Sequence, residues 1–231
     1  MKKAILLISV LFVLSCYKKT DLKADFEKNF EKRALTDTIE HFTDSINFGL
    51  KHKNKIEIYK IGTEENTIAK IYFFEIKKDK WSLKDSLTLD AERINNLNPE
   101  IIDFNNDNFK DIVFTTGMAA RGGNVIQTLI LYSTEKESLL WIKNSENFPN
   151  LMYNEKLDCI DALILTGGQK TSFLKIKNDS LEEFAYVDQS DGRILAKILD
   201  ANGKWKEIEN IKDDPKNFDR FINFNPIEKR E

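Results

Sequence analysis

Four side chains that carry oxygen recur along one short segment of the chain. Asp103, Asn105, Asp107 and Asp111 fall at positions one, three, five and nine of a loop between two apolar runs. Carboxylates crowded into so short a loop repel one another unless a cation neutralises them, and calcium takes six to eight oxygen ligands in flexible geometry. Position seven adds the carbonyl oxygen of Phe109. The segment therefore predicts a bound Ca2+ with a structural role.

Two further positions of this loop define its type. Position six needs a positive φ, and it holds Asn108, the residue that best replaces glycine there. Position twelve is Phe114, where an EF-hand has a glutamate, so the loop is expected to join strands and not helices. A metal-free loop remains the alternative, because Asp and Asn side chains can bond their own backbone as Asx-turns.

Other residue types that do chemistry lack the context that catalysis needs. His41 and His52 have no ligand spacing, and no Gly-x-Ser-x-Gly motif accompanies any serine. Cys159 has no adjacent basic residue that would lower its pKa, so a buried, inert thiol is expected. We therefore expect a protein without catalytic activity.

The N-terminus has the layout of a secretory signal. Two lysines precede an apolar run over residues 4–14, and Ser15 stands directly before Cys16. Residues 13–16 resemble the lipobox of bacterial lipoproteins, which implies cleavage before Cys16 and a lipid on its thiol. We expect residues 1–15 to be a signal peptide and the rest to be anchored in the bacterial cell envelope. Processing by the ordinary signal peptidase is the alternative.

The next residues show helical spacing. Residues 16–34 are dense in charge and are expected to form a tether or helix, with Leu22, Phe26 and Phe30 four residues apart. A second apolar stripe follows, with Asp37 and Glu40 at the spacing of a capping box. This pattern predicts an N-terminal amphipathic helical segment. The stripe consists of Leu35, Ile39, Phe42, Ile46 and Leu50.

From residue 55 onward the apolar period changes to two, which is typical of strands. Polar turn signals separate the runs at about ten-residue intervals, for example Lys78-Asp79, Asp191-Gly192 and Asn202-Gly203. We predict a mainly β fold, an antiparallel meander of propeller-like or curved-sheet form, in a single domain over residues 35–231. Asp214, Pro215, Phe218, Phe221 and Ile222 predict a short C-terminal helix.

Charge and cysteine content exclude some partners. The net charge is −3, and residues 1–15 contain two lysines and no acid, so the chain without them is more acidic. With no basic stripe to offset this charge, nucleic acid is not expected as a partner. Cys159 is the only cysteine besides Cys16, so a lipidated Cys16 would leave no disulfide within the chain.

The segment 103–111 resembles the Asp-x-Asn-x-Asp-Gly-x-x-Asp loops of FG-GAP and VCBS type β-propeller repeats, with Asn108 in place of the glycine. A propeller would repeat the loop once per blade, and this chain has it once. The chain also has a glycine-containing loop, Gly117–Asn124, and the segment Phe148–Leu151. With these, residues 98–187 are similar to a family of small periplasmic calcium-binding β proteins.

Members of that family include immunity proteins that inhibit lysozyme-like, peptidoglycan-cleaving toxins through a protruding loop. The resemblance implies a partner-binding role for Arg121, Gly122, Gly123 and Asn124, or for the loop at 167–171. We expect a lipid-anchored envelope binding protein whose partner is a cell-wall hydrolase or another envelope protein. Two other functions stay open: a glycan-binding or hydrolytic lipoprotein with its site near Trp141 or Trp205, and a structural component of an envelope assembly.

Overall fold

Antiparallel strands make up most of the chain in the computed structural model, which describes residues 38–62, 66–212 and 219–231. Within these residues the strands form three larger sheets and one hairpin, and the helices are two short 3-10 segments, η1 (Ala120–Gly122) and η2 (Ser145–Asn147). All described residues belong to one compact unit, Asp37–Glu231. The prediction of a mainly β, antiparallel fold is confirmed.

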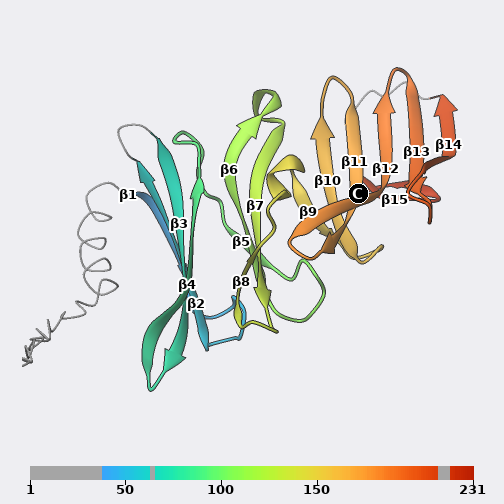
Figure 1. The fold of residues 1–231 in the computed structure, drawn as a ribbon. Coiled ribbons are helices and arrows are strands. Elements are labelled where there is room, and N and C mark those ends of the chain that lie inside the picture. The colour runs from blue at the N-terminus through green and yellow to red at the C-terminus, as the bar shows by residue number, and fades with distance from the viewer. Residues whose placement is uncertain (1–37, 63–65, 213–218) are drawn as a thin grey trace, which may run out of the picture. The chain divides into compact units, whose positions relative to one another are not determined.

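The first sheet follows the order of the sequence and appears in blue to teal in Figure 1. It contains β1 (Thr38–Asp44), β2 (Asn54–Gly62), β3 (Thr67–Lys77) and β4 (Lys80–Asp90). Alternation of buried and partly buried residues over residues 54–60 of β2 and 67–74 of β3 places Ile56, Ile58, Ile71 and Phe73 in the core. The predicted turn at Lys78-Asp79 joins β3 to β4, and both residues adopt positive φ.

The second and third sheets continue the meander along the chain (Figure 1). The second sheet contains β5 (Glu100–Ile102), β6 (Asp111–Ala119), β7 (Asn124–Ser133) and β8 (Ser138–Trp141). The third sheet runs from β9 (Leu151–Asn154) through β10 (Cys159–Leu165), β11 (Gln169–Lys177), β12 (Ser180–Ser190) and β13 (Arg193–Leu199) to β14 (Trp205–Lys212).

The second sheet is covered on both faces. Ile112 and Phe114 of β6 pack into a cluster with the first sheet, whereas Val113, between them, packs into a cluster with the third sheet. Consecutive residues at the start of β6 are therefore all buried. This arrangement fixes the second sheet, which carries the predicted calcium loop, between its two neighbours.

Two asparagines, one at the start of β7 and one in the loop after β8, join the second sheet to strands of the third. The Asn124 amide donates to the Leu165 carbonyl at 3.0 Å and accepts from the Leu165 N–H at 2.9 Å. Asn144 makes the same pair of bonds with Leu181, at 2.9 and 2.7 Å. Each side-chain amide thus takes the place of a peptide group in a β-ladder.

The predicted C-terminal helix is wrong where the structure describes it. Phe221 and Ile222 lie in β15 (Phe221–Phe224), which pairs with β16 (Ile227–Lys229) as a hairpin. Phe221 is fully buried, and its N–H donates to the Thr171 hydroxyl of β11. Packing against the third sheet therefore decides the conformation of these residues over the helical spacing. Residues 214, 215 and 218 lie outside the described residues.

The predicted N-terminal helical segment is also wrong over residues 38–50. Ile39 and Phe42 lie in β1, and Ile39 and Ile46 are exposed. Glu40 does not form a capping box, because its carboxylate accepts from the Leu97 N–H at 2.9 Å. Asp44 ends the strand by accepting from the N–H groups of the three residues 46–48. Pairing with β2 and this turn outweigh the helical spacing.

Residues 1–37 are outside the described part of the chain. The signal peptide, Cys16 and the tether over residues 16–34 are therefore still predictions. Within the residues that are described, no helix has the length and apolar character that crossing a membrane requires.

Candidate functional site

The loop between β5 and β6 brings three of the predicted calcium ligands together. The Asp103 carboxylate accepts from the backbone N–H groups of Asp107 (3.1 Å) and Asn108 (2.8 Å). Asn105 donates from its amide to Asp107 at 2.8 Å, and Asp107 accepts from the Phe109 N–H at 2.9 Å. These bonds fold the segment into consecutive Asx-turns.

Two asparagines allow the loop to turn this sharply. Asn106 has φ +57° and Asn108 has φ +71°, both in the left-handed region. Asparagine is the non-glycine residue that adopts this region at least cost, because its short amide can bond locally. The positive φ expected at Asn108 is therefore present.

Asp111 lies apart from these three side chains, at the start of β6. It is fully buried, and its two carboxylate oxygens accept from the N–H groups of Phe104 (2.9 Å) and Tyr132 (3.0 Å). The pKa of Asp111 is raised to about 7, mainly by burial and also by the charges of Asp107 and Asp103, while the two backbone hydrogen bonds oppose the shift. Asp111 thus joins the loop to β7.

No group of three or more His, Cys, Asp or Glu side chains converges as a metal site within the residues that the structure describes. The donor chemistry of the loop nevertheless suits calcium, because the side chains of Asp103, Asn105 and Asp107 offer hard oxygen atoms within one short turn. In this structure the three side chains are hydrogen-bonded within the loop, and the Asp111 carboxylate faces the N–H groups of Phe104 and Tyr132.

The residues predicted to bind a partner lie at the tip of the β6–β7 hairpin. Ala120, Arg121 and Gly122 form η1, and all three are exposed. Ala120 has φ +49° and Arg121 has φ +56°, so two consecutive residues other than glycine adopt the left-handed region. Each costs on the order of 1 kcal/mol, and strain of this kind is characteristic of functional loops.

Gly123 and Asn124 have a structural role at the base of this tip. Asn124 is buried and bonds Leu165, and a Cβ at Gly123 would lie 2.8 Å from Cδ1 of the same leucine. Leu165 is the last residue of β10, directly before the turn that contains Gly167. The two loops that the sequence nominated separately are therefore neighbours in the fold.

A third loop lies against the β6 side of this hairpin. The Glu92 N–H donates to the Thr116 carbonyl at 2.7 Å, and the Glu92 carboxylate accepts from the Met118 N–H at 3.2 Å. Ile94, two residues further on, is 89% exposed, and Met118 is also exposed. We call residues 92–95, 118–123 and 165–168 the loop end. It combines large apolar side chains in water with the cation of Arg121, a composition typical of binding surfaces.

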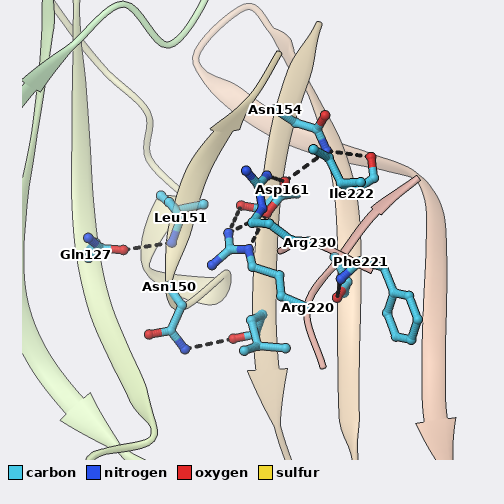
Figure 2. A network of polar contacts seen from close by, with 11 residues as sticks. Gln127, Asn150, Leu151, Asn154, Asp161, Arg220, Phe221, Ile222 and Arg230 are labelled. Carbon is cyan, nitrogen blue, oxygen red and sulfur yellow. Dashed lines mark hydrogen bonds and ion pairs between the residues drawn. The ribbon is translucent and has the colours of Figure 1, made fainter. Parts of the chain in front are cut away.

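A buried ionic network was not predicted from the sequence. The carboxylate of Asp161, in β10, receives the guanidiniums of Arg220 and Arg230 and the amide of Asn154, as Figure 2 shows. The sequence does contain one signal, since Asp161 interrupts the apolar run of β10. The two arginines are 59 and 69 residues away from Asp161 in the sequence, too far for a local sequence pattern to predict the contact.

The remaining chemistry-bearing residues are placed as follows. His41 stacks on Tyr59 with ring centroids 4.2 Å apart. Cys159 is buried, and burial raises the pKa of its thiol to about 12, so it is a poor nucleophile. Trp141 packs against the core between the first two sheets, whereas Trp205 is 42% exposed beside Tyr186.

Comparison with known proteins identifies no family for this chain. No protein-family model matches it, and no curated protein matches it. One solved structure that resembles it is described as "Structure of a Xanthomonas Type IV Secretion System related protein". The two share 11% sequence identity with a TM-score of 0.47, over 74% of this chain and 93% of the other.

Proposed function

We propose that this chain is a non-enzymatic binding protein of the bacterial envelope that contacts a protein partner through its loop end. The observation that carries the proposal is the exposed, strained tip at Ala120 and Arg121. A strained conformation persists only where the surrounding structure holds it. Here the bonds between Asn124 and Leu165 hold the base of the tip.

The class of partner follows from the charge of the tip and from the resemblance to hydrolase inhibitors. Glycan-cleaving hydrolases act with a pair of carboxylates in an open cleft. An exposed guanidinium on a protruding hairpin is complementary to such a cleft, since arginine pairs with carboxylates through two parallel hydrogen bonds. The net charge of −3 favours encounter with a basic enzyme. We therefore propose a peptidoglycan hydrolase as the partner.

Reversing the charge of Arg121 tests this assignment. Arg121→Glu is expected to weaken inhibition of a lysozyme-like hydrolase at least tenfold, because it replaces attraction to the cleft carboxylates with repulsion. Lys136→Glu is the matched control, since Lys136 is exposed in the turn after β7, at the other end of that strand. The readout is the rate of cell-wall lysis against inhibitor concentration. If a panel of such hydrolases is neither bound nor slowed by the wild type, the hydrolase assignment is wrong.

We further propose that Ca2+ holds the 103–111 loop. The side chains of Asp103, Asn105 and Asp107 would bind the ion, and the Phe109 carbonyl would be a further ligand. Asp111, the fifth predicted ligand, lies apart from them with both carboxylate oxygens on backbone N–H groups, so it would have to turn toward the loop to bind the ion. The support for this is the donor set and the positive φ of Asn108. The ion would neutralise neighbouring carboxylates and fix the connection between β5 and β6.

Calcium is expected to raise the melting temperature by about 3 to 5 °C. At an affinity near 10⁻⁴ M, typical of extracellular modules, ~1 mM calcium stabilises the fold by about 1.4 kcal/mol, and a domain of this size converts that into the stated shift. Asp107→Ala should remove the dependence on calcium. The measurement is thermal unfolding with calcium and with chelator.

The matched control is Asp200→Ala. Asp200 accepts from the N–H groups of Asn202 and Lys204 in the turn between β13 and β14, so its loss also removes Asx-type bonds. That variant should keep the full response to calcium. A wild-type melting curve that chelator leaves unmoved would rule out the metal.

The anchor is the remaining part of the proposal, and it rests on residues 13–16 of the sequence. A lipid on Cys16 would hold the chain at the membrane, in the envelope. After detergent phase separation, the wild type is then expected in the detergent phase and Cys16→Ser in the aqueous phase. Equal partitioning of the two would contradict the anchor.

A further inference from the structure

The C-terminal hairpin presents two arginines to one carboxylate. Arg220 precedes β15 and Arg230 follows β16, and the Arg230 N–H donates to the Arg220 carbonyl at 2.6 Å, so the two are cross-strand neighbours. Both guanidiniums reach Asp161 in the third sheet, as Figure 2 shows. The amide of Asn154 donates to the same carboxylate at 2.9 Å. Both carboxylate oxygens of Asp161 therefore already accept hydrogen bonds from these side chains.

The charges of this network do not balance. The hairpin also forms ion pairs between Lys229 and Asp219 at 2.7 Å and between Lys156 and Glu228. Asp161 is shared by two cations, and no second acidic side chain forms an ion pair with either of them in the described part of the chain. One positive charge of the pair is left without a partner there.

This charge is also shielded from water. The side chains of Arg220 and Arg230 are only 13% and 21% exposed, and Asp161 is fully buried. A charge with little access to water is costly unless an opposite charge or hydrogen-bond acceptors replace the solvent. A bound anion would supply both.

Several donors of the two guanidiniums remain available. Asp161 uses Nε and Nη2 of Arg220 and Nη2 of Arg230. The Nε atom of Arg230 is buried and has no hydrogen-bond acceptor among the described residues. Buried polar groups are nearly always satisfied in folded proteins, so an unsatisfied guanidinium nitrogen indicates a site for an additional acceptor.

We propose that the remaining donors of Arg220 and Arg230 bind an oxyanion, a carboxylate or a phosphate group, which completes the charge balance of the network. The planar guanidinium matches these two groups, because each offers paired oxygens to parallel N–H donors. Chloride has no such pair of oxygens. This site is separate from the loop end and does not depend on the proposed function.

The test compares anions at equal ionic strength. The full chain, freed of divalent cations on a chelating resin, is melted at pH 7 in sodium phosphate, sodium acetate or sodium chloride. An anion at about tenfold its dissociation constant should raise the melting temperature by about 3 to 5 °C over chloride. A response to phosphate alone assigns a phosphate group, and a response to acetate alone assigns a carboxylate. If neither differs from chloride, the proposal is wrong.

Variants locate the effect at the network. Arg230→Gln is expected to weaken binding of the responding anion at least tenfold by titration calorimetry at a temperature where the variant is folded. Arg230→Lys keeps the charge and should also bind more weakly, because lysine lacks the planar fork. Lys229→Gln is the control, since Lys229 is exposed and paired with Asp219. Unchanged affinity in both Arg230 variants would show an adventitious ion only.

Discussion

Replacing Asp161 with alanine is expected to destabilise the fold by about 3 to 5 kcal/mol, the cost of leaving buried charge without its partner. Asp161 is fully buried and holds two guanidiniums through its side chain. Without the Asp161 carboxylate, Arg220 and Arg230 remain close together with no opposite charge, so that repulsion between two cations is added to the cost of their burial. Urea unfolding followed by tryptophan fluorescence measures the change.

The same hairpin supplies the control for this prediction. Glu228 pairs with Lys156, and both side chains are about two-fifths exposed. Ion pairs in such positions contribute about 0 to 1 kcal/mol, so Glu228→Ala should have little effect. If Asp161→Ala were as mild as Glu228→Ala, the network could not be what fastens β15 and β16 to the third sheet.

Phe48→Ala is expected to cost about 3 to 5 kcal/mol as well, as is usual for a large cavity in a packed core. Phe48 is fully buried where the first two sheets meet, and its ring lies edge-on to Phe73 of β3 (5.9 Å) and Tyr132 of β7 (6.3 Å). The next residue, Gly49, donates its N–H to the Lys110 carbonyl at 2.9 Å. Losing the ring would therefore loosen contacts in both sheets.

Ile46→Ala distinguishes this structure from a helix over the same residues. Ile46 is 49% exposed, so its truncation should change the free energy of unfolding by no more than about 0.5 kcal/mol. A helical stripe through Ile39, Phe42 and Ile46 would make Ile46 a core residue and Phe48 an exposed one. Comparable losses for Ile46→Ala and Phe48→Ala in urea unfolding would contradict the strand and turn described above.

The strands were predictable because their signals are local. Alternation in β2 and β3 and the turn pairs Lys78-Asp79 and Asp191-Gly192 specify their hairpins without distant contacts. Where the structure describes them, over residues 38–50 and at Phe221 and Ile222, the two predicted helices failed for the opposite reason. Apolar residues at helical spacing also fit a short strand followed by a turn, and only pairing with β2 or packing on the third sheet decides between them.

In the candidate sites, too, the features with local sequence signals were predictable and those that depend on distant contacts were not. The position of the 103–111 loop between two strands and the left-handed conformation of Asn108 follow from the order of residues within the loop. The burial of Asp111 does not, because it depends on Tyr132, 21 residues away. Asn124 was grouped with Arg121 by its place in the sequence, yet its amide faces Leu165 and leaves Arg121 as the exposed member.

The bonds of Asn124 to Leu165 and of Asn144 to Leu181 have a consequence for binding kinetics. They join the second and third sheets at two separate places. The tips at 118–123 and 165–168 therefore cannot move independently without breaking the paired hydrogen bonds between these asparagine amides and the leucine backbone. A partner would then meet a surface that is already ordered and would lose little conformational entropy on docking. For such a preorganised surface, substitutions among its contact residues should change the lifetime of the complex far more than its rate of formation.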